Sequence, residues 1–68
     1  MPYVNVRITD ENVTAEKKAQ VIAGITDVLV RVLGKNPDTT HVIIDEVPLE
    51  NWGIKGKTVA ELRKQPKA

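Results

Sequence analysis

The second residue of the chain is a proline, and an alternation of polar and apolar residues follows it directly over residues 3–9. If Met1 is removed, the ring nitrogen of Pro2 becomes a secondary amine at the chain terminus, which no other residue type can supply. An ordinary α-amino group titrates near pH ~8, and a dry pocket or nearby cations lower that value because they disfavour the charged form. Such an amine is suited to proton abstraction next to a carbonyl group. If Met1 stays, the nitrogen is a tertiary amide without basicity.

Three other side chains are candidates for a role beside Pro2. His41, the single histidine, begins a predicted strand, where a surface or interface role is the alternative to catalysis. Arg7 lies on the polar face of the first predicted strand and could supply a cation, although a surface ion pair is the reading we favour. Trp52, the single tryptophan, either walls a site or packs in an apolar interface between chains.

Composition excludes several other kinds of site. The 68 residues include no cysteine and one histidine, so neither a disulfide nor a protein-only zinc site is expected, and we predict no metal and no cofactor. The net charge is +1, with 10 basic and 9 acidic residues mixed along the chain, which gives no support for a nucleic-acid partner. No apolar run approaches the ~20 residues that cross a bilayer, and nothing resembles a signal peptide. We therefore expect a soluble, cytoplasmic protein without a membrane partner.

The elements that must position these residues follow from periodicity. Residues 3–9 alternate as a half-buried strand does. A helix is predicted over residues 15–33, with Thr14 as its N-cap and Gly34 at its end. Its apolar stripe, which we expect to cover one face of the sheet, comprises Val21, Ile22, Ile25, Val28, Leu29, Val32 and Leu33.

A second strand is predicted over residues 41–47, and its continuous apolar centre, residues 42–44, suggests burial on both faces. Strand, helix and strand make a right-handed βαβ unit. Residues 52–57 predict a tight hairpin or a bulged loop, and Thr58 caps a short helix that runs through Arg63. We expect residues 64–68 to fray. The fold class is therefore α/β, as a single domain over residues 1–68.

So small a domain needs support beyond its own core. A chain of this length buries only about 60% of the surface that its unfolded form exposes, and two strands are too few for a stable sheet. Without disulfides or metals, the remaining means of stabilisation is oligomerisation. We therefore predict a homo-oligomer that is not folded as a monomer at micromolar concentration.

The order of these features resembles the 4-oxalocrotonate tautomerase family, the short-chain type of the tautomerase superfamily. The resemblance covers nearly the full chain: Pro2 after the initiator Met1, a strand, a capped helix, the strand His-Val-Ile-Ile-Asp-Glu from His41, and then the aromatic-Gly-Ile-x-Gly motif from Trp52 to Gly56. Each feature alone is common. Their order, spacing and total length together are specific.

The resemblance implies a βαβ protomer that dimerises into a four-stranded sheet, with three dimers forming a hexamer. It implies an isomerase whose terminal proline is a general base for keto–enol or double-bond isomerisation of a small 2-oxo or 2-hydroxy-dienoic acid. The substrate is thus a small-molecule carboxylate, as in the degradation of aromatic compounds. Two arginines hold the substrate, and an aromatic residue keeps the pocket dry.

Transferred residue by residue, Pro2 matches the base and Trp52 the aromatic residue. The arginines have no match, because Asn12 or Val13 stands at the first position and His41 at the second. Two alternatives stay open. One is a hydratase or dehalogenase on the same fold, for which Glu46 and Glu50 are possible acids. The other is a non-catalytic oligomeric binding protein that has kept the scaffold.

Overall fold

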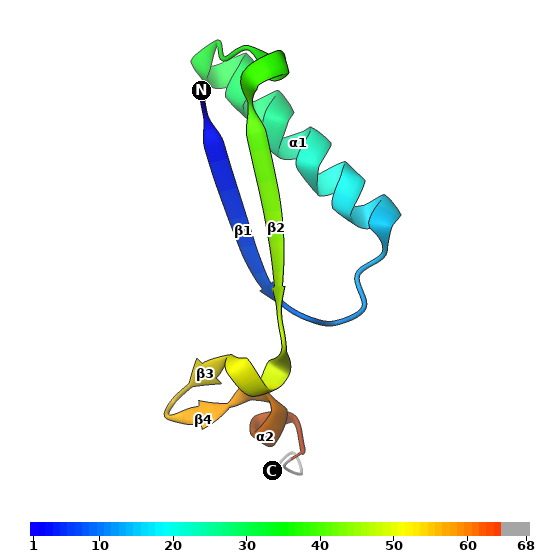
Figure 1. Ribbon diagram of the computed structural model, residues 1–68, viewed down its shortest axis with the longest axis vertical. Helices are drawn as coiled ribbons and strands as arrows, with labels where there is room; N and C mark the ends of the chain where they lie inside the picture. The colour runs from blue at the N-terminus through cyan, green and yellow to red at the C-terminus, as the bar shows by residue number, and fades with distance from the viewer. Residues whose placement is uncertain (65–68) are drawn as a thin grey trace.

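The computed structural model describes residues 1–64 of the chain, and its order of elements begins with a βαβ unit. Strand β1 (Tyr3–Thr9) and strand β2 (His41–Val47) are parallel neighbours, joined through helix α1 (Ala15–Leu33). Figure 1 shows α1 beside the two strands, with the elements that follow β2 beyond the carboxyl ends of the strands. The molecule is elongated, with principal extents of 47 × 24 × 19 Å.

Helix α1 begins and ends at the predicted residues because both ends have a local reason. The Thr14 hydroxyl accepts a hydrogen bond from the backbone nitrogen of Lys17 at 3.2 Å, which satisfies one of the free donors of the first turn. Gly34 has φ 66°, a left-handed conformation that glycine adopts without steric cost. Its nitrogen donates to the carbonyl oxygen of Val30 at 3.0 Å, which closes the last turn.

A short 3-10 turn, η1 (Pro37–Thr39), leads into β2. The side chain of Asn36 accepts from the backbone nitrogen of Asp38 at 2.9 Å and so caps this turn. The register of the sheet pairs Tyr3 with His41 at one end and Thr9 with Val47 at the other. The two strands therefore run side by side over their full length.

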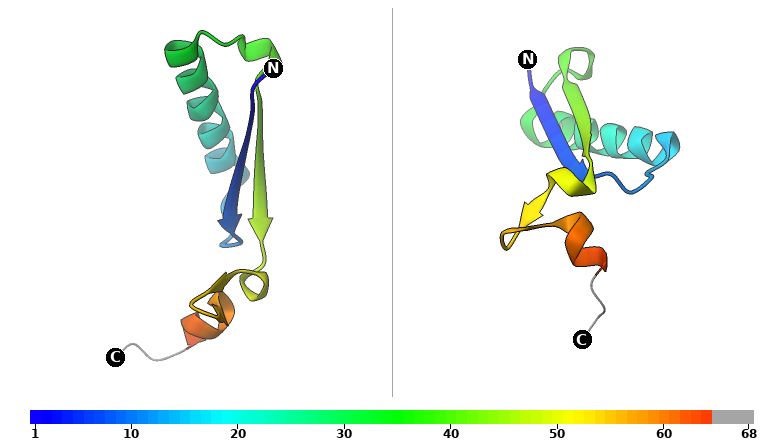
Figure 2. Two further views of the ribbon diagram at one scale, coloured as in Figure 1. Left: turned by 90° about the vertical axis from the view of Figure 1, so that its left-hand side faces the viewer. Right: turned by 60° about the horizontal axis from the view of Figure 1, so that its bottom comes forward.

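Helix α1 lies over one face of the sheet, as Figure 2 shows, and the apolar contact zone lies between the two. The strand residues on this face are half-buried: Val4, Val6, Ile8, Val42 and Ile44. Ile25 and Leu29 are the half-buried members of the predicted helix stripe, together with Thr26 and Val30 outside it. The ion pair between Lys18 of α1 and Glu46 of β2 lies at the same interface.

The predicted helix stripe is wrong in one respect, because much of it does not cover the sheet. Val21, Val28, Val32 and Leu33 stay exposed, with Val32 at 69%. A helix is about 10 Å across and two strands are only about 5 Å apart, so the stripe is wider than this sheet can cover. Burial of β2 on both faces is likewise not found, because Ile43 is 45% exposed on the face opposite α1.

Beyond β2, the chain forms a 3-10 turn η2 (Leu49–Asn51), a hairpin and a final helix. Strands β3 (Gly53–Ile54) and β4 (Lys57–Thr58) pair in antiparallel fashion around the two-residue turn of Lys55 and Gly56, so the predicted hairpin is confirmed. The Thr58 hydroxyl accepts from the nitrogen of Glu61 at 3.1 Å. This cap opens helix α2 (Val59–Lys64), as predicted.

The predicted α/β class, with one βαβ unit, a hairpin and a short helix, is therefore confirmed. The expected fraying of the tail lies outside the described residues except for Lys64, which is the last residue of α2. Among residues 1–64, no helix has the length and apolar character needed to span a membrane.

Candidate functional site

Pro2 and His41 are neighbours at the amino ends of the two parallel strands. The backbone nitrogen of His41 donates to the carbonyl oxygen of Pro2 at 2.9 Å, which extends the sheet ladder by one bond before Tyr3. Pro2 is half-buried, while His41 is exposed and Met1 is 87% exposed. The proline is therefore fixed through its carbonyl group, and the residue ahead of it extends into solvent.

Arg7 lies on the sheet face opposite α1 and is paired across the sheet with Asp45. Its Nε atom lies 3.6 Å from Oδ2 of that carboxylate, so the surface ion pair that we favoured is confirmed. Sequence reasoning missed a second contact, in which Nδ2 of Asn5 donates to the same Oδ2 at 2.9 Å. The strand alternation placed both side chains on one face, but only the register of β2 could identify Asp45 as their common partner. Asp45 and Glu46 face opposite ways, as predicted.

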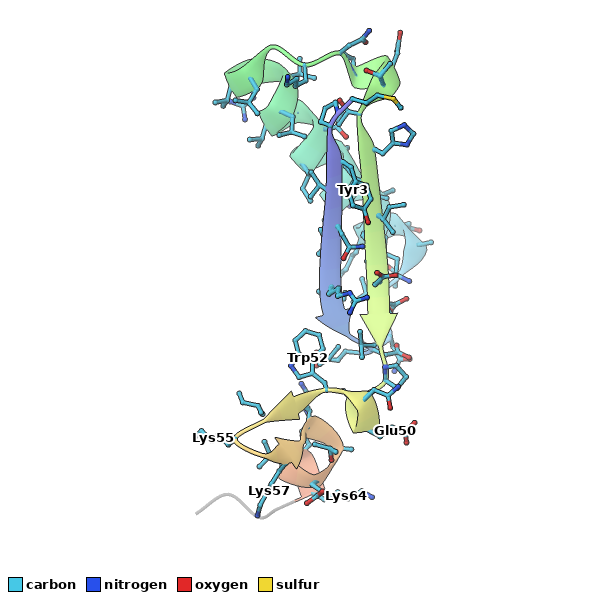
Figure 3. The ribbon with its side chains drawn as sticks, turned by 60° about the vertical axis from the view of Figure 1, so that its left-hand side comes forward. Tyr3, Glu50, Trp52, Lys55, Lys57 and Lys64 are labelled. Carbon is cyan, nitrogen blue, oxygen red and sulfur yellow. The ribbon has the colours of Figure 1, made fainter. Side chains whose placement is uncertain are left out.

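Trp52 lies at the other end of the strands, where it ends η2 and enters the hairpin. Its carbonyl oxygen accepts from the nitrogen of Val59 at 2.8 Å, which joins the hairpin to α2. In Figure 3 its ring points from the hairpin toward the ends of the strands, whereas Tyr3 lies in the opposite half of the molecule. The seven residues of β1 separate Pro2 from this end by about 20 Å at ~3.3 Å per residue.

Asn12 lies in the connection between β1 and α1 and has φ 61°, a left-handed conformation that asparagine tolerates better than most residues. Val13, the other residue at the position of the first family arginine, is half-buried. Both belong to the connection that leaves the carboxyl end of β1, so neither lies beside Pro2 at its amino end.

The residue before Asn12 makes contacts that the sequence did not reveal. Glu11 accepts a hydrogen bond from Nη1 of Arg63 in α2 at 2.8 Å and another from the Thr9 hydroxyl. The hydrogen bond from Arg63, and to a smaller extent that from Thr9, lowers the pKa of the Glu11 carboxyl from its ordinary value of 4.5. The same contact raises the pKa of Arg63. This pair links α2 to the β1–α1 connection.

The structure therefore divides the predicted site residues into two groups. Pro2 and His41 lie at the amino ends of the strands, and Trp52 and Asn12 lie beyond the carboxyl ends, with Arg7 between them on the open face. The part of the chain that the structure describes encloses no pocket. Within that same part, no three His, Cys, Asp or Glu side chains gather in a way that could hold a metal ion.

Comparison with known proteins gives a family with this arrangement. The family described as "Tautomerase enzyme" matches residues 2–62. A probable tautomerase K2 of Dickeya dadantii is 63% identical over 65 residues, which is 96% of this chain and 97% of that protein. A 2-hydroxymuconate tautomerase of Pseudomonas putida is 39% identical over 62 residues, which is 91% of this chain and 97% of that protein. The crystal structure of DmpI from Helicobacter pylori superposes with a TM-score of 0.86 at 42% identity, covering 96% of this chain and 100% of that one.

Proposed function

The chain belongs to the tautomerase family, and from that premise we propose that it is an isomerase in which Pro2, freed by removal of Met1, is the general base. Family membership supports tautomerase activity as the general class of reaction. The secondary amine of Pro2 accepts a proton from an enol or from a carbon next to a carbonyl group. The resulting prolinium returns the proton to another atom of the conjugated system, so the substrate is isomerised without a net loss of atoms or electrons.

The observation that carries the proposal is the position of Pro2. The hydrogen bond from the His41 nitrogen to its carbonyl oxygen holds the residue at a strand end, and Met1 is 87% exposed ahead of it. Removal of Met1 takes away no residue of the sheet, because β1 begins at Tyr3. The base is thus carried on a rigid element, which suits the accurate positioning that proton transfer requires.

The site is proposed to form between copies of the chain. Pro2 and Trp52 match two residues of one family pocket, yet β1 separates them by about 20 Å within this protomer. A second copy that brings its hairpin to the amino ends of these strands unites the two halves. The same association covers apolar side chains that one chain leaves exposed, among them Val28 and Val32 of α1 and Ile43 of β2. A homo-oligomer, as a dimer or hexamer, is therefore part of the proposal.

The proposed substrate is a small 2-oxo or 2-hydroxy-dienoic acid. This class includes 2-hydroxymuconate, which is named in the designation of the Pseudomonas putida relative. The backbone of His41 lies beside that of Pro2, which supports the proposal that the imidazole donates a hydrogen bond to an enolate oxygen. Asn12 lies on the half of the site that holds Trp52. Both are proposed to contact the substrate in place of the family arginines.

Pro2→Ala in the Met1-free protein tests this function. Alanine keeps a terminal amine, but a primary one that no ring holds in place, so we expect the rate with an enol substrate to fall about 10²–10⁴-fold, the usual contribution of a general base. The rate of the unsubstituted protein should rise with pH along a limb near neutrality. An unchanged rate for Pro2→Ala would reject Pro2 as the base.

A further inference from the structure

A substrate carboxylate needs a cation, and the arginines of this chain are already engaged. Each of the three contacts a carboxylate of its own chain, in the pairs Arg7–Asp45, Arg31–Asp27 and Arg63–Glu11. In each pair the carboxylate offsets the charge of the guanidinium, so an arginine held in this way attracts a further carboxylate less strongly than an unpaired cation does. The cation that binds the substrate is therefore to be sought among the lysines.

The lysines differ in whether a carboxylate of the chain engages them. Lys18 forms an ion pair with Glu46 between α1 and β2. Lysines without an ion-pair partner among residues 1–64 are Lys17, Lys35, Lys55, Lys57 and Lys64. Two of these, Lys55 and Lys57, belong to the hairpin that Trp52 enters.

Lys55 occupies a backbone position that disfavours lysine. It has φ 56° and Gly56 has φ 78°, so both residues of the two-residue turn are left-handed. A turn of this kind favours glycine or asparagine at its first position, because a Cβ atom lies close to a carbonyl oxygen there, and asparagine compensates by hydrogen bonding to the local backbone. A residue that opposes the preference of its turn is a reason to look for a function.

Lys55 follows Trp52 by three residues in the same hairpin segment. Three residues of chain separate their Cα atoms by at most about 11 Å, and the lysine stem adds several ångströms of reach. In Figure 3, Lys55 projects from the tip of the hairpin, whereas the Lys57 side chain points away from the Trp52 ring. Lys57 therefore serves as a matched control on the same hairpin.

We propose that Lys55 binds a carboxylate of the substrate at the Trp52 half of the site and so supplies a positive charge that the uncharged Asn12 does not. This inference rests on the proposed function. Its ammonium group is a point charge on a flexible stem, which holds one carboxylate without the bidentate geometry of arginine. The contact makes Lys55 a determinant of specificity for charged substrates, and proton transfer remains with Pro2.

The test compares Lys55→Asn with Lys55→Arg and Lys57→Gln. The substrates are the enol of phenylpyruvate and the methyl ester of that enol, which lacks the negative charge. For Lys55→Asn we expect KM to rise about tenfold or more for the acid, with little change in kcat and no change with the ester. Lys55→Arg should restore most of the loss, and Lys57→Gln should behave as the unsubstituted protein. An unchanged KM for the acid, or an equal loss with acid and ester, overturns the proposal.

Folding and the proposed function are controlled separately. Asparagine suits the turn, so Lys55→Asn should unfold at the same or a higher temperature than the unsubstituted protein. A rise in KM then does not come from a folding defect. Fumarate, a dicarboxylate without an enol, is titrated against Trp52 fluorescence. Weaker binding by Lys55→Asn supports the Lys55 contact even if neither enol is turned over, in which case the proposed function alone fails. Equal fumarate binding by both proteins overturns the Lys55 contact.

Discussion

Pro2 and Trp52 show what a motif can predict about single residues. Both were predicted as site residues from a motif whose order and spacing are specific, and their roles stay predictions. The structure adds the hydrogen bond that fixes Pro2. Asn5, Glu11 and Arg63 could not be found in this way, because their contacts join residues 40 and 52 positions apart. Only the parallel register and the return of α2 bring those partners together.

Replacing Trp52 with alanine tests its role in the pocket. If the ring keeps water from the Pro2 amine, its removal favours the protonated form, so the ascending limb of the pH–rate curve moves to higher pH. For a limb centred near pH 7, a displacement of one pH unit lowers the free-base fraction at pH 7 about fivefold, and activity should partly return in more alkaline buffer. If Trp52 only packs in the interface between chains, its replacement should lower activity equally at every pH. The two proteins are compared at a concentration at which the variant is still assembled. If the ascending limb of the pH–rate curve does not move, Trp52 is an interface residue only.

At the scale of elements, the sequence predicted the bounds of β1, α1 and β2 because each has a local signal. Period-two alternation, the Thr14 cap and the left-handed Gly34 all act within a few residues. The facing of α1 was harder to predict. Its apolar stripe is wider than one chain's sheet, so the stripe alone did not determine which side chains contact β2 and which stay exposed, as Val21 and Val28 do.

The contact between Glu11 and Arg63 predicts a pH dependence for the attachment of α2. The pKa of Glu11 is lower in the folded protein than its ordinary 4.5, so its contribution is present above that value and is lost as pH falls through the lower, folded pKa. Glu11→Gln should therefore speed amide hydrogen exchange in α2 at neutral pH. The difference from the unsubstituted protein should vanish at acid pH.

Glu50→Gln is the control for this pair, because it removes an exposed carboxylate that has no ion-pair partner among the described residues. It should leave the exchange of α2 unchanged. Equal effects of the two substitutions at neutral pH would show that general charge, and not the contact with Arg63, holds the helix. The effect of Glu11→Gln should be small, since exposed ion pairs contribute little to stability.

At the scale of the whole molecule, one chain leaves much apolar surface in contact with water. Val28, Val32 and Leu33 of α1 and Ile43 of β2 are all exposed, and each of the two parallel strands has a free edge in the two-stranded sheet. The sequence predicted oligomerisation from chain length and composition. It could not predict which surfaces meet, because that depends on where exposed side chains gather after folding.

Sedimentation should therefore show an assembled protein at micromolar concentration. A second copy that pairs with a free strand edge and covers the exposed apolar side chains supplies the core that one chain lacks. Analytical ultracentrifugation measures the mass directly. A compact, folded species near 7.5 kDa would contradict this prediction. Val32→Lys, which places a charge on the exposed helix stripe, should weaken assembly if that stripe lies in the interface.

Removal of Met1 tests the central claim most directly, because it changes the nitrogen of Pro2 from an amide to an amine and alters no other group of the site. Protein that retains Met1 is treated with a methionine aminopeptidase, and intact mass and enol turnover are followed in the same samples. We predict that activity rises in proportion to the fraction of chains whose mass has fallen by one methionine residue. Full activity in chains that still retain Met1 would contradict the account. So would the absence of activity after Met1 has been removed from all chains.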